Sequence, residues 1–409
     1  MSIIMNTPDI ESELKGTLCN TSGCCIDPPK KWDDFGLCDD LLRGIYSYGF
    51  EVPSEIQQKA IIPIMSGRDI IAQAKSGSGK TATFTIGSLQ CIDLVKGTQV
   101  LVLSPTHELV RQTSCVFTSL GMKMENLSIK TLVGGVPVAN DINEMRLKVP
   151  HVIVGSPGRG FDLIERHTIN VKCIKLVILD EADELLSSGF KTDIFNIFNY
   201  LNEDIQVAMF SATLPDEILT LINTIMRNPV RITVKSDELN VEGIEQFYIT
   251  VSDDRAKFEK IKLLYSTLVM SQCVIFVNSV NRVIDLYDSL NNEGFPVSCI
   301  HSSMSKADRE KSLSEFRRGA TRTLISSNII ARGIDVQQVG MVINFDICND
   351  VHTYLHRIGR GGRYGKKGIA INLITRYDIE MLKKIEKHYK VTINEYIIPS
   401  ASASNANLH

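Results

Sequence analysis

The segment Ala74–Thr81, which reads AKSGSGKT, constrains the fold of this chain more than any other stretch. It follows an apolar run that ends at Ala72 and precedes a segment with helical character, Ala82–Leu94. A strand, a glycine-rich loop and a helix in this order are typical of a phosphate-binding loop. Gly77 and Gly79 allow the backbone to turn sharply, so that its N–H groups face one point. We therefore expect phosphate groups to bind here.

The residues of this loop receive specific predicted roles. Lys80 would reach the β and γ phosphates of a nucleotide, and the Thr81 hydroxyl would hold Mg²⁺. The alternative is an ordinary turn before a helix; Ala74 stands where the general pattern has Gly, but Gly-Lys-Thr lies in the right context. The predicted nucleotide-binding residues of the loop are Ala74, Lys75, Ser76, Gly77, Ser78, Gly79, Lys80 and Thr81.

Short apolar runs alternate with amphipathic helical stretches along most of the chain. This pattern predicts an α/β fold, with mainly parallel sheets that carry helices on both faces. Ligands of such sheets bind beyond the carboxyl ends of the strands, so motifs that follow the runs are candidates for one shared crevice. The runs are Val100–Leu103, Lys130–Val133, His151–Val154, Lys175–Leu179, Val207–Phe210, Val230–Val234, Ile244–Thr250, Cys273–Val277, Val297–Ile300, Thr323–Ile325, Met341–Phe345 and Ile369–Ile374.

The length of 409 residues and a polar interruption indicate two such domains. The second series of runs has no phosphate loop of its own, which suggests that the second domain completes the site of the first. The predicted boundaries are a flexible tail over 1–31, a first domain over 32–234, a linker over 235–243, a second domain over 244–400 and a flexible tail over 401–409.

Composition excludes several classes of protein. The net charge of -3 provides no global basic surface for nucleic acid, so any such surface must be local. We find no signal peptide and no apolar run near the roughly 20 residues that span a bilayer. The cysteines are scattered without paired CxxC motifs, so we expect reduced thiols in an intracellular protein and no zinc site.

Acidic residues follow the run that ends at Leu179, with the sequence Asp180-Glu181-Ala182-Asp183. Asp180 could bind Mg²⁺ through water, as acidic residues do in phosphate-loop NTPases. Glu181 could orient and activate the attacking water. The alternative is a helix start decorated with acids, which is favourable in itself. The upstream phosphate loop favours the catalytic interpretation.

The order of motifs resembles that of the DEAD-box RNA helicases over roughly residues 32–395. The motifs are GFEVPSEIQ, AKSGSGKT, PTHEL, GG, SPGR, DEAD, SAT, ARGID and HRIGRGGR. The resemblance implies two tandem RecA-like domains, joined by a short linker, that use ATP and Mg²⁺ to separate short RNA duplexes through domain closure. Within the family, the chain is most similar to helicases of translation initiation, with exon-junction helicases as the near alternative.

The resemblance also implies roles for residues outside the loop. It assigns adenine recognition to Gln57 and adenine stacking to Trp32, for which a core tryptophan is the alternative. It makes Arg360 and Arg363 arginine fingers on the γ phosphate, for which a basic RNA-binding loop is the alternative. The remaining implied residues are Gly333 and Asp335 for the nucleotide, with Asp335 on the ribose, and Ser211 and Thr213 for coupling hydrolysis to domain movement.

RNA contacts implied by the resemblance go mainly to phosphates and 2′-hydroxyls, with little sequence preference. They comprise Pro105, Thr106, Gly134, Gly135, Ser156, Pro157, Gly158, Arg159, Arg309 and Ser326. The chain departs from the family pattern at four positions of this surface, with His107 for Arg, Val280 for Arg, Lys306 for Gln and Asn328 for Asp. Because two expected cations are lost and one is gained, we expect weaker RNA binding with less dependence on salt.

Three functions are thus considered. The first is an ATP-dependent RNA helicase of translation initiation that works as a monomer in the cytoplasm, with a nuclear location as the alternative. Its partners would be a scaffold protein of the initiation-factor four-G type and an RNA-binding stimulator. The second is an ATP-gated RNA clamp of the exon-junction type, and the third is a relative that acts on DNA. His352 and His356 are four residues apart, but HExxH is not met, so both are interpreted as motif or packing histidines.

Overall fold

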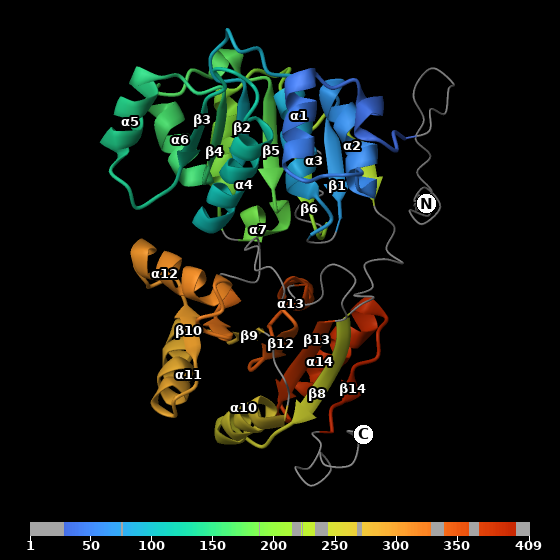
Figure 1. The fold of residues 1–409 in the computed structure, drawn as a ribbon, viewed down its shortest axis with the longest axis vertical. Coiled ribbons are helices and arrows are strands. Elements are labelled where there is room, and N and C mark those ends of the chain that lie inside the picture. Colours follow the sequence, from blue (N-terminus) through green and yellow to red (C-terminus); the bar gives the residue numbers. More distant parts are fainter. Residues whose placement is uncertain are drawn as a thin grey trace, which may run out of the picture.

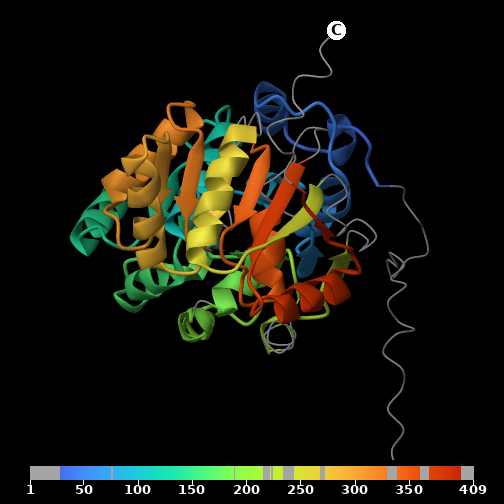
Figure 2. The same cartoon turned by 90° about the horizontal axis from the view of Figure 1, so that it is seen from below.

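The computed structural model contains two α/β domains, one above the other in Figure 1. It describes residues 28–74, 77–187, 189–214, 222, 224–233, 244–267, 272–328, 339–359 and 368–397. Seen from below, the second domain lies in front of the first (Figure 2). Among the described residues, no helix is both long enough and apolar enough to span a membrane.

The first domain is built on seven parallel strands in the order β3-β4-β2-β5-β6-β1-β7. They are β1 (Ile70–Gln73), β2 (Val100–Leu103), β3 (Ile129–Leu132), β4 (Val152–Gly155), β5 (Leu176–Asp180), β6 (Gln206–Ser211) and β7 (Val230–Thr233). The helical segments are η1 (Trp32–Phe35), α1 (Asp39–Ser47), α2 (Glu55–Met65), α3 (Lys80–Gln90), α4 (His107–Leu120), α5 (Val138–Leu147), α6 (Pro157–Glu165), η2 (Val171–Cys173), α7 (Ala182–Ser187) and α8 (Lys191–Tyr200).

The second domain repeats this architecture with the strand order β10-β11-β9-β12-β13-β8-β14. Its strands are β8 (Ile244–Thr250), β9 (Cys273–Phe276), β10 (Val297–Ile300), β11 (Thr323–Ser326), β12 (Met341–Asn344), β13 (Gly368–Ile374) and β14 (Asn394–Glu395). Its helices are α10 (Asp254–Thr267), α11 (Val280–Asn292), α12 (Lys306–Arg317), α13 (Val351–Ile358) and α14 (Ile379–Tyr389).

Continuous apolar runs form these sheets because each central strand is buried on both faces. Along β2, Val100 and Val102 pack into one core cluster of the first domain, and Leu101 and Leu103 pack into another. Among the described residues, neither cluster contains one from the second domain, whose own clusters begin at β8 or later. Each domain therefore has its own hydrophobic core.

The predicted α/β fold with two parallel sheets is confirmed, and most strands lie within two residues of their predicted bounds. Strand β14 was not predicted, because it has only two residues and no apolar run. The helix after the phosphate loop begins at Lys80, earlier than the predicted Ala82. The predicted linker and the tail from 401 lie outside the described residues, so the domain boundaries remain predictions.

Candidate nucleotide and RNA site

The phosphate loop has the backbone shape that its glycines predict. Gly77 has a φ of 80° and Gly79 a φ of 100°, both in the left-handed region that favours glycine. A Cβ on Gly79 would lie only 2.9 Å from Gln57 Nε2 and 3.1 Å from Ser54 Oγ. The Ser54 hydroxyl also donates a hydrogen bond to the Ser78 carbonyl over 2.8 Å. The start of α2 is therefore packed directly against the loop, and only glycine fits at position 79.

Gln57 is buried and serves as part of the cap of α2. The Ser54 N–H donates to Gln57 Oε1 over 2.7 Å, within a capping box in which Ser54 also caps the helix. This bond fixes the amide so that Nε2 faces Gly79. The arrangement brings Gln57 to the phosphate loop, as the prediction requires, while its contact with adenine stays a prediction.

Trp32, the predicted adenine-stacking residue, is fully buried. Its ring packs with Phe35 and Phe50, at centroid distances of 5.6 Å and 6.1 Å. The indole N–H is also buried and has no hydrogen-bond partner among the described residues. A stacking residue needs one free face, and Trp32 has none in this structure. Burial thus favours the alternative interpretation, a core tryptophan.

Lys80 and Glu181 meet at the carboxyl end of the first sheet. Lys80 Nζ donates to the Ala74 carbonyl over 3.0 Å and lies 3.5 Å from Glu181 Oε1. Both side chains are buried, and Glu181 Oε2 is buried without a hydrogen-bond partner among the described residues. An unsatisfied buried carboxylate oxygen is costly unless something binds there. It is therefore available to accept a proton from a ligand such as water.

Glu181 also occupies a strained backbone position, with a φ of 48°. A non-glycine residue in the left-handed region costs about 1–3 kcal/mol and persists only where the surroundings enforce it. Here the strain lies between the end of β5 at Asp180 and the start of α7 at Ala182. Strained residues of this kind cluster at active sites, which supports a catalytic role for Glu181.

Asp180 ends β5 and is almost completely buried. Burial and, after it, the neighbouring Glu181 charge raise the pKa of its carboxyl to about 7, although Lys80 opposes the shift. The Ser104 hydroxyl lies 3.5 Å from Asp180 Oδ2. A divalent cation would hold the carboxylate in its ionised form, so the buried Asp180 carboxylate suits a Mg²⁺ ligand. The Thr81 hydroxyl, at the start of α3, stays a predicted ligand.

A hydrogen-bond network links the predicted coupling residues to the second domain. The Asp183 N–H donates to Ser211 Oγ over 3.3 Å, and Ser211 Oγ donates to the Thr213 carbonyl over 2.7 Å. Thr213 Oγ1 donates to Asp183 Oδ2 over 2.7 Å. The same carboxylate oxygen lies 3.0 Å from His356 Nε2 of α13, where the imidazole donates because a carboxylate only accepts. The network thus crosses from one domain to the other.

Asp183 and His356 were not among the predicted site residues. Both are buried, and their contact joins the DEAD segment to the HRIGR segment. The sequence did contain a signal, because both residues belong to motifs of the resemblance. Their partnership across 173 positions, however, follows only from the packing of the two domains.

The predicted RNA-binding residues occupy loops and helix starts at the same edge of the sheets. Thr106 caps α4, and its hydroxyl accepts from the Leu109 N–H over 3.3 Å. Arg159 is held by Asp141 and by the Val136 carbonyl. Pro105 precedes Thr106, Gly134 and Gly135 follow β3, Ser156, Pro157 and Gly158 start α6, and Ser326 ends β11.

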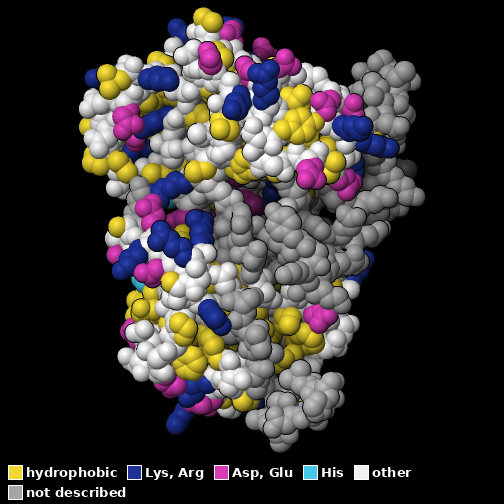
Figure 3. Space-filling model, viewed as in Figure 1, with side chains coloured by type: hydrophobic (Ala, Val, Ile, Leu, Met, Phe, Trp, Pro, Cys, Tyr) yellow, Lys and Arg dark blue, Asp and Glu magenta, His cyan; other side chains and the backbone are white. Residues whose placement is uncertain are grey.

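Arg309 reaches across to the first domain. Its Nη1 lies 3.0 Å from Glu108 Oε1 of α4, and both side chains are mostly buried. Arg111 of α4 contacts Glu310 of α12, so in this pair the first domain supplies the base and the second domain the acid. Figure 3 shows Lys and Arg side chains beside acidic ones where the two domains face each other. This local mixture of charges is compatible with the small net charge of the chain.

The four departures from the family pattern have different surroundings. His107 begins α4, and its Nε2 lies 3.3 Å from the position of a Cβ on Gly134. Burial lowers the pKa of His107, and nearby arginines lower it further, although Glu108 opposes the shift. Val280 begins α11, and Lys306 begins α12 with a side chain outside the described part of the chain.

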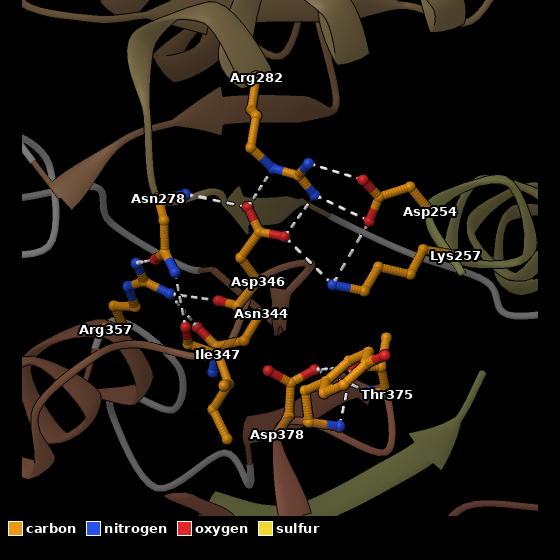
Figure 4. A network of polar contacts seen from close by, with 11 residues as sticks. Asp254, Lys257, Asn278, Arg282, Asn344, Asp346, Ile347, Arg357, Thr375 and Asp378 are labelled. Atoms are coloured by element: carbon orange, nitrogen blue, oxygen red, sulfur yellow. Dashed lines mark hydrogen bonds and ion pairs between the residues drawn. The ribbon is translucent and has the colours of Figure 1, made fainter. Parts of the chain in front are cut away.

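Asn328 contacts the buried Arg357. Figure 4 shows Arg357 with its other partners Asn278, Asn344 and Asp346. Asn328 Oδ1 accepts from Arg357 Nε over 2.9 Å and from Nη2 over 2.6 Å. The other acceptors are Asn278 Oδ1, Asn344 Oδ1 and the Asp346 carbonyl. Among the described residues, every hydrogen-bond acceptor of Arg357 is therefore a neutral oxygen. Burial accordingly lowers the pKa of the Arg357 guanidinium.

Asp346 accepts from Arg357 through its carbonyl, but its carboxylate is bound by other cations. Arg282 and Lys257 converge on it, with Arg282 Nη2 at 2.6 Å and Lys257 Nζ at 3.1 Å (Figure 4). The Asn278 N–H donates to the same carboxylate over 3.1 Å. Arg357 is thus a fully buried cation that has no carboxylate partner of its own among the described residues.

We expect Asn328→Asp to stabilise the second domain, because it supplies this missing carboxylate. Asn328 is itself exposed, so desolvation of the new charge would cost little. A hydrogen bond between charged groups exceeds a neutral one by about 1–2 kcal/mol, and the free energy of unfolding should rise by this amount. Urea unfolding followed by circular dichroism measures it. Asn291→Asp, at an exposed position of α11, is the control, and equal midpoints for wild type and Asn328→Asp would contradict the account.

Several predicted residues lie outside the described part of the chain. They are Lys75 and Ser76 of the phosphate loop, Gly333 and Asp335 of the ARGID motif, and the predicted arginine fingers Arg360 and Arg363. Their roles remain predictions. The described residue nearest to the fingers is Gly359, which caps α13 directly before Arg360.

Comparisons with known proteins agree with this geometry. The DEAD/DEAH box helicase family matches residues 54–221, and the helicase conserved C-terminal domain matches residues 256–365. The ATP-dependent RNA helicase eIF4A of Scheffersomyces stipitis is 49% identical over 366 residues, 89% of this chain and 92% of the relative. Eukaryotic initiation factor 4A-III homolog A of Oryza sativa subsp. japonica is 47% identical over 365 residues, 89% of this chain and 90% of the relative.

A solved structure extends the similarity to three dimensions. S. cerevisiae Dbp5 bound to RNA and ADP BeF3 matches with a TM-score of 0.83 at 33% sequence identity. The match covers 90% of this chain and 96% of that chain, so it includes both domains. A single score of this size over both domains means that the two proteins arrange their domains similarly.

Proposed function

The chain belongs to the DEAD/DEAH box helicase family and is an ATP-dependent RNA helicase, and from this premise we propose that ATP and RNA together close its two domains around a shared site. One observation carries the proposal. Lys80 and Glu181 converge beside the phosphate loop, while Asp183 of the same acidic motif contacts His356 of the second domain. The predicted catalytic residue, Glu181, is therefore only two positions in the chain from Asp183, which contacts the second domain.

Within this site, each described residue has a distinct task. Lys80 Nζ moves from the Ala74 carbonyl and Glu181 to the β and γ phosphates. Glu181 Oε2, which is buried without a partner among the described residues, accepts a proton from the attacking water. Mg²⁺ held by Thr81 and Asp180 would offset the negative charge that the phosphate oxygens carry. Gln57 reads the edge of the adenine base from its fixed position beside Gly79.

The second domain supplies charge from the opposite side. His356 and Arg357 are anchored in α13, and the predicted fingers Arg360 and Arg363 follow directly after it. In the closed state these arginines stabilise the charge that develops on the γ phosphate. Ser211 accepts from the Asp183 N–H, and Thr213 donates to the Asp183 carboxylate that meets His356. A change at the acidic motif is therefore transmitted to α13.

We place this activity in translation initiation, in the cytoplasm, because the S. stipitis relative is named eIF4A. The chain would act as a monomer together with a scaffold protein of the initiation-factor four-G type and an RNA-binding stimulator. RNA would bind as a single strand or short duplex through its phosphates and 2′-hydroxyls, with little sequence preference.

The test of the proposal is unwinding of a short RNA duplex with ATP in excess over the enzyme. We expect many duplexes to be separated per enzyme molecule, and ATP hydrolysis to be stimulated by single-stranded RNA. An ATP-gated clamp would instead release RNA once, slowly, for each ATP. Stronger stimulation by DNA than by RNA of equal length would contradict the assignment to RNA.

We further expect His107→Arg to strengthen RNA binding. The imidazole is half-buried among the cations Arg111, Arg159 and Arg309, and burial lowers its pKa, so it is neutral at pH 7. An added cation should contact one more phosphate and steepen the dependence of log K on log salt by about 0.7 for a single strand. Fluorescence anisotropy with labelled single-stranded RNA over a salt series measures this slope. His167→Arg, at an exposed turn, is the control, and an unchanged slope for His107→Arg would count against the contact.

A further inference from the structure

Helices α4 and α12 face each other across the two domains through four charged residues. The charge seam consists of Glu108 and Arg111 on α4 and of Arg309 and Glu310 on α12. Glu108 pairs with Arg309 at 3.0 Å, and Arg111 contacts Glu310. Each helix thus offers one acid and one base, and each finds the opposite charge on the other domain.

Arg111 is one helical turn after His107, on the same face of α4. His107 stands where the family pattern has an arginine, and burial, helped by the nearby arginines, lowers the pKa of its imidazole. The cation that α4 presents to the second domain therefore lies at position 111, whereas the family pattern has one at position 107. Its contact with Glu310 joins the two domains directly, without an RNA phosphate as a bridge.

The surroundings of Arg111 distinguish it from an ordinary surface arginine. Its side chain is 27% exposed, and Nη2 is buried without a hydrogen-bond partner among the described residues. A partly desolvated guanidinium depends on its acidic partner more than a solvated one does. The adjacent Arg309 is more buried still, and its Nε is likewise unpartnered among the described residues. Loss of Glu310 would therefore loosen the whole seam.

We propose that Arg111 is a positioning residue for RNA binding, which through Glu310 holds α12, and with it Arg309, against the first domain. This inference rests on the proposed RNA-dependent closure of the domains. Arg111 substitutes for the cation that His107 does not provide. A change at Arg111 should alter the concentration of RNA that closure requires. It should not alter the chemical step, because Lys80 and Glu181 remain in place.

The test compares RNA-stimulated ATP hydrolysis of the full chain with Arg111→Ala, Glu310→Ala, the double variant and the exchanged pair Arg111→Glu with Glu310→Arg. A half-exposed ion pair is worth up to about 1 kcal/mol, or about fivefold in an equilibrium. Each single variant should need about three to five times more single-stranded RNA for half-maximal stimulation, with the rate at saturating RNA unchanged. The double variant should be no worse than either single one, and the exchanged pair should restore the wild-type value.

The control is Lys123→Ala, which removes one exposed positive charge shortly after the end of α4. It should leave the RNA requirement unchanged. If Glu310→Ala is silent and the exchanged pair fails to restore the Arg111→Ala defect, Arg111 acts by itself on RNA and the proposal is overturned. If the wild type shows no stimulation by RNA at all, the proposed function fails first. If stimulation is normal but both single variants match the wild type, only the charge seam is refuted.

Discussion

Glu181→Gln protein is expected to hydrolyse ATP about 100- to 10,000-fold more slowly than the wild type at saturating RNA, the range that general base catalysis contributes. The reason is geometric. Glu181 Oε2 is buried at the end of β5 without a partner among the described residues, while Oε1 lies 3.5 Å from Lys80 Nζ. An amide has the same shape but cannot take the proton of the attacking water. Steady-state phosphate release with and without single-stranded RNA measures the effect.

Two further measurements make this prediction specific. ATP binding by Glu181→Gln should stay within a few-fold of the wild type, because the phosphate loop and Gln57 are unchanged. Glu165→Gln, the same substitution at an exposed position of α6, is the matched control and should be fully active. A Glu181→Gln protein with undiminished turnover would remove Glu181 from the mechanism.

Arg360→Ala is expected to lower the rate of hydrolysis of bound ATP by about 1,000- to 100,000-fold, the range typical of an arginine finger. The supporting contacts lie immediately upstream in α13. His356 reaches the Asp183 carboxylate of the first domain, and Arg357 is bonded to oxygens from four neighbouring residues. The helix that directly precedes Arg360 in the sequence is thus anchored beside the acidic motif of the first domain. A single-turnover experiment with prebound ATP and saturating RNA separates the loss of chemistry from any loss of binding.

The control for this prediction removes one arginine charge at a position that has no predicted role in the site. Arg318→Ala, at the exposed end of α12, should hydrolyse ATP at the wild-type rate. RNA binding offers a second readout, since the alternative interpretation of Arg360 is a basic RNA contact. If Arg360→Ala binds RNA weakly yet hydrolyses ATP normally once RNA is saturating, the finger assignment is wrong and the RNA-contact interpretation is right.

The sequence predicted the parallel sheets because strands such as β2 and β5 are buried on both faces and must be apolar throughout. It also predicted the glycine loop, since the left-handed φ of Gly79 and its contact with Gln57 both require a residue without Cβ. At these positions, the amino-acid types themselves show what the local structure requires. Their prediction therefore needed no knowledge of the remaining fold.

Other features depended on contacts between distant segments and could not be predicted. The strained φ of Glu181 is imposed by its surroundings, because nothing in the type of residue demands it. The burial of Trp32 results from packing with Phe35 and Phe50, which a lone tryptophan in a polar approach segment did not indicate. Likewise, the charge seam depends on how α4 and α12 come to face each other, which no motif of either helix encodes.

The central claim is that one ATP site is divided between two domains, and the turnover of the first domain alone tests it most directly. Residues 1–233 contain the complete first sheet and two hydrophobic core clusters with no residue from the second domain, so this fragment is expected to fold. Its ATP hydrolysis is compared with that of the full chain at saturating single-stranded RNA. The account predicts that the fragment binds nucleotide but turns it over at least about 1,000-fold more slowly, without stimulation by RNA. A folded fragment that matched the RNA-stimulated rate of the full chain would contradict it.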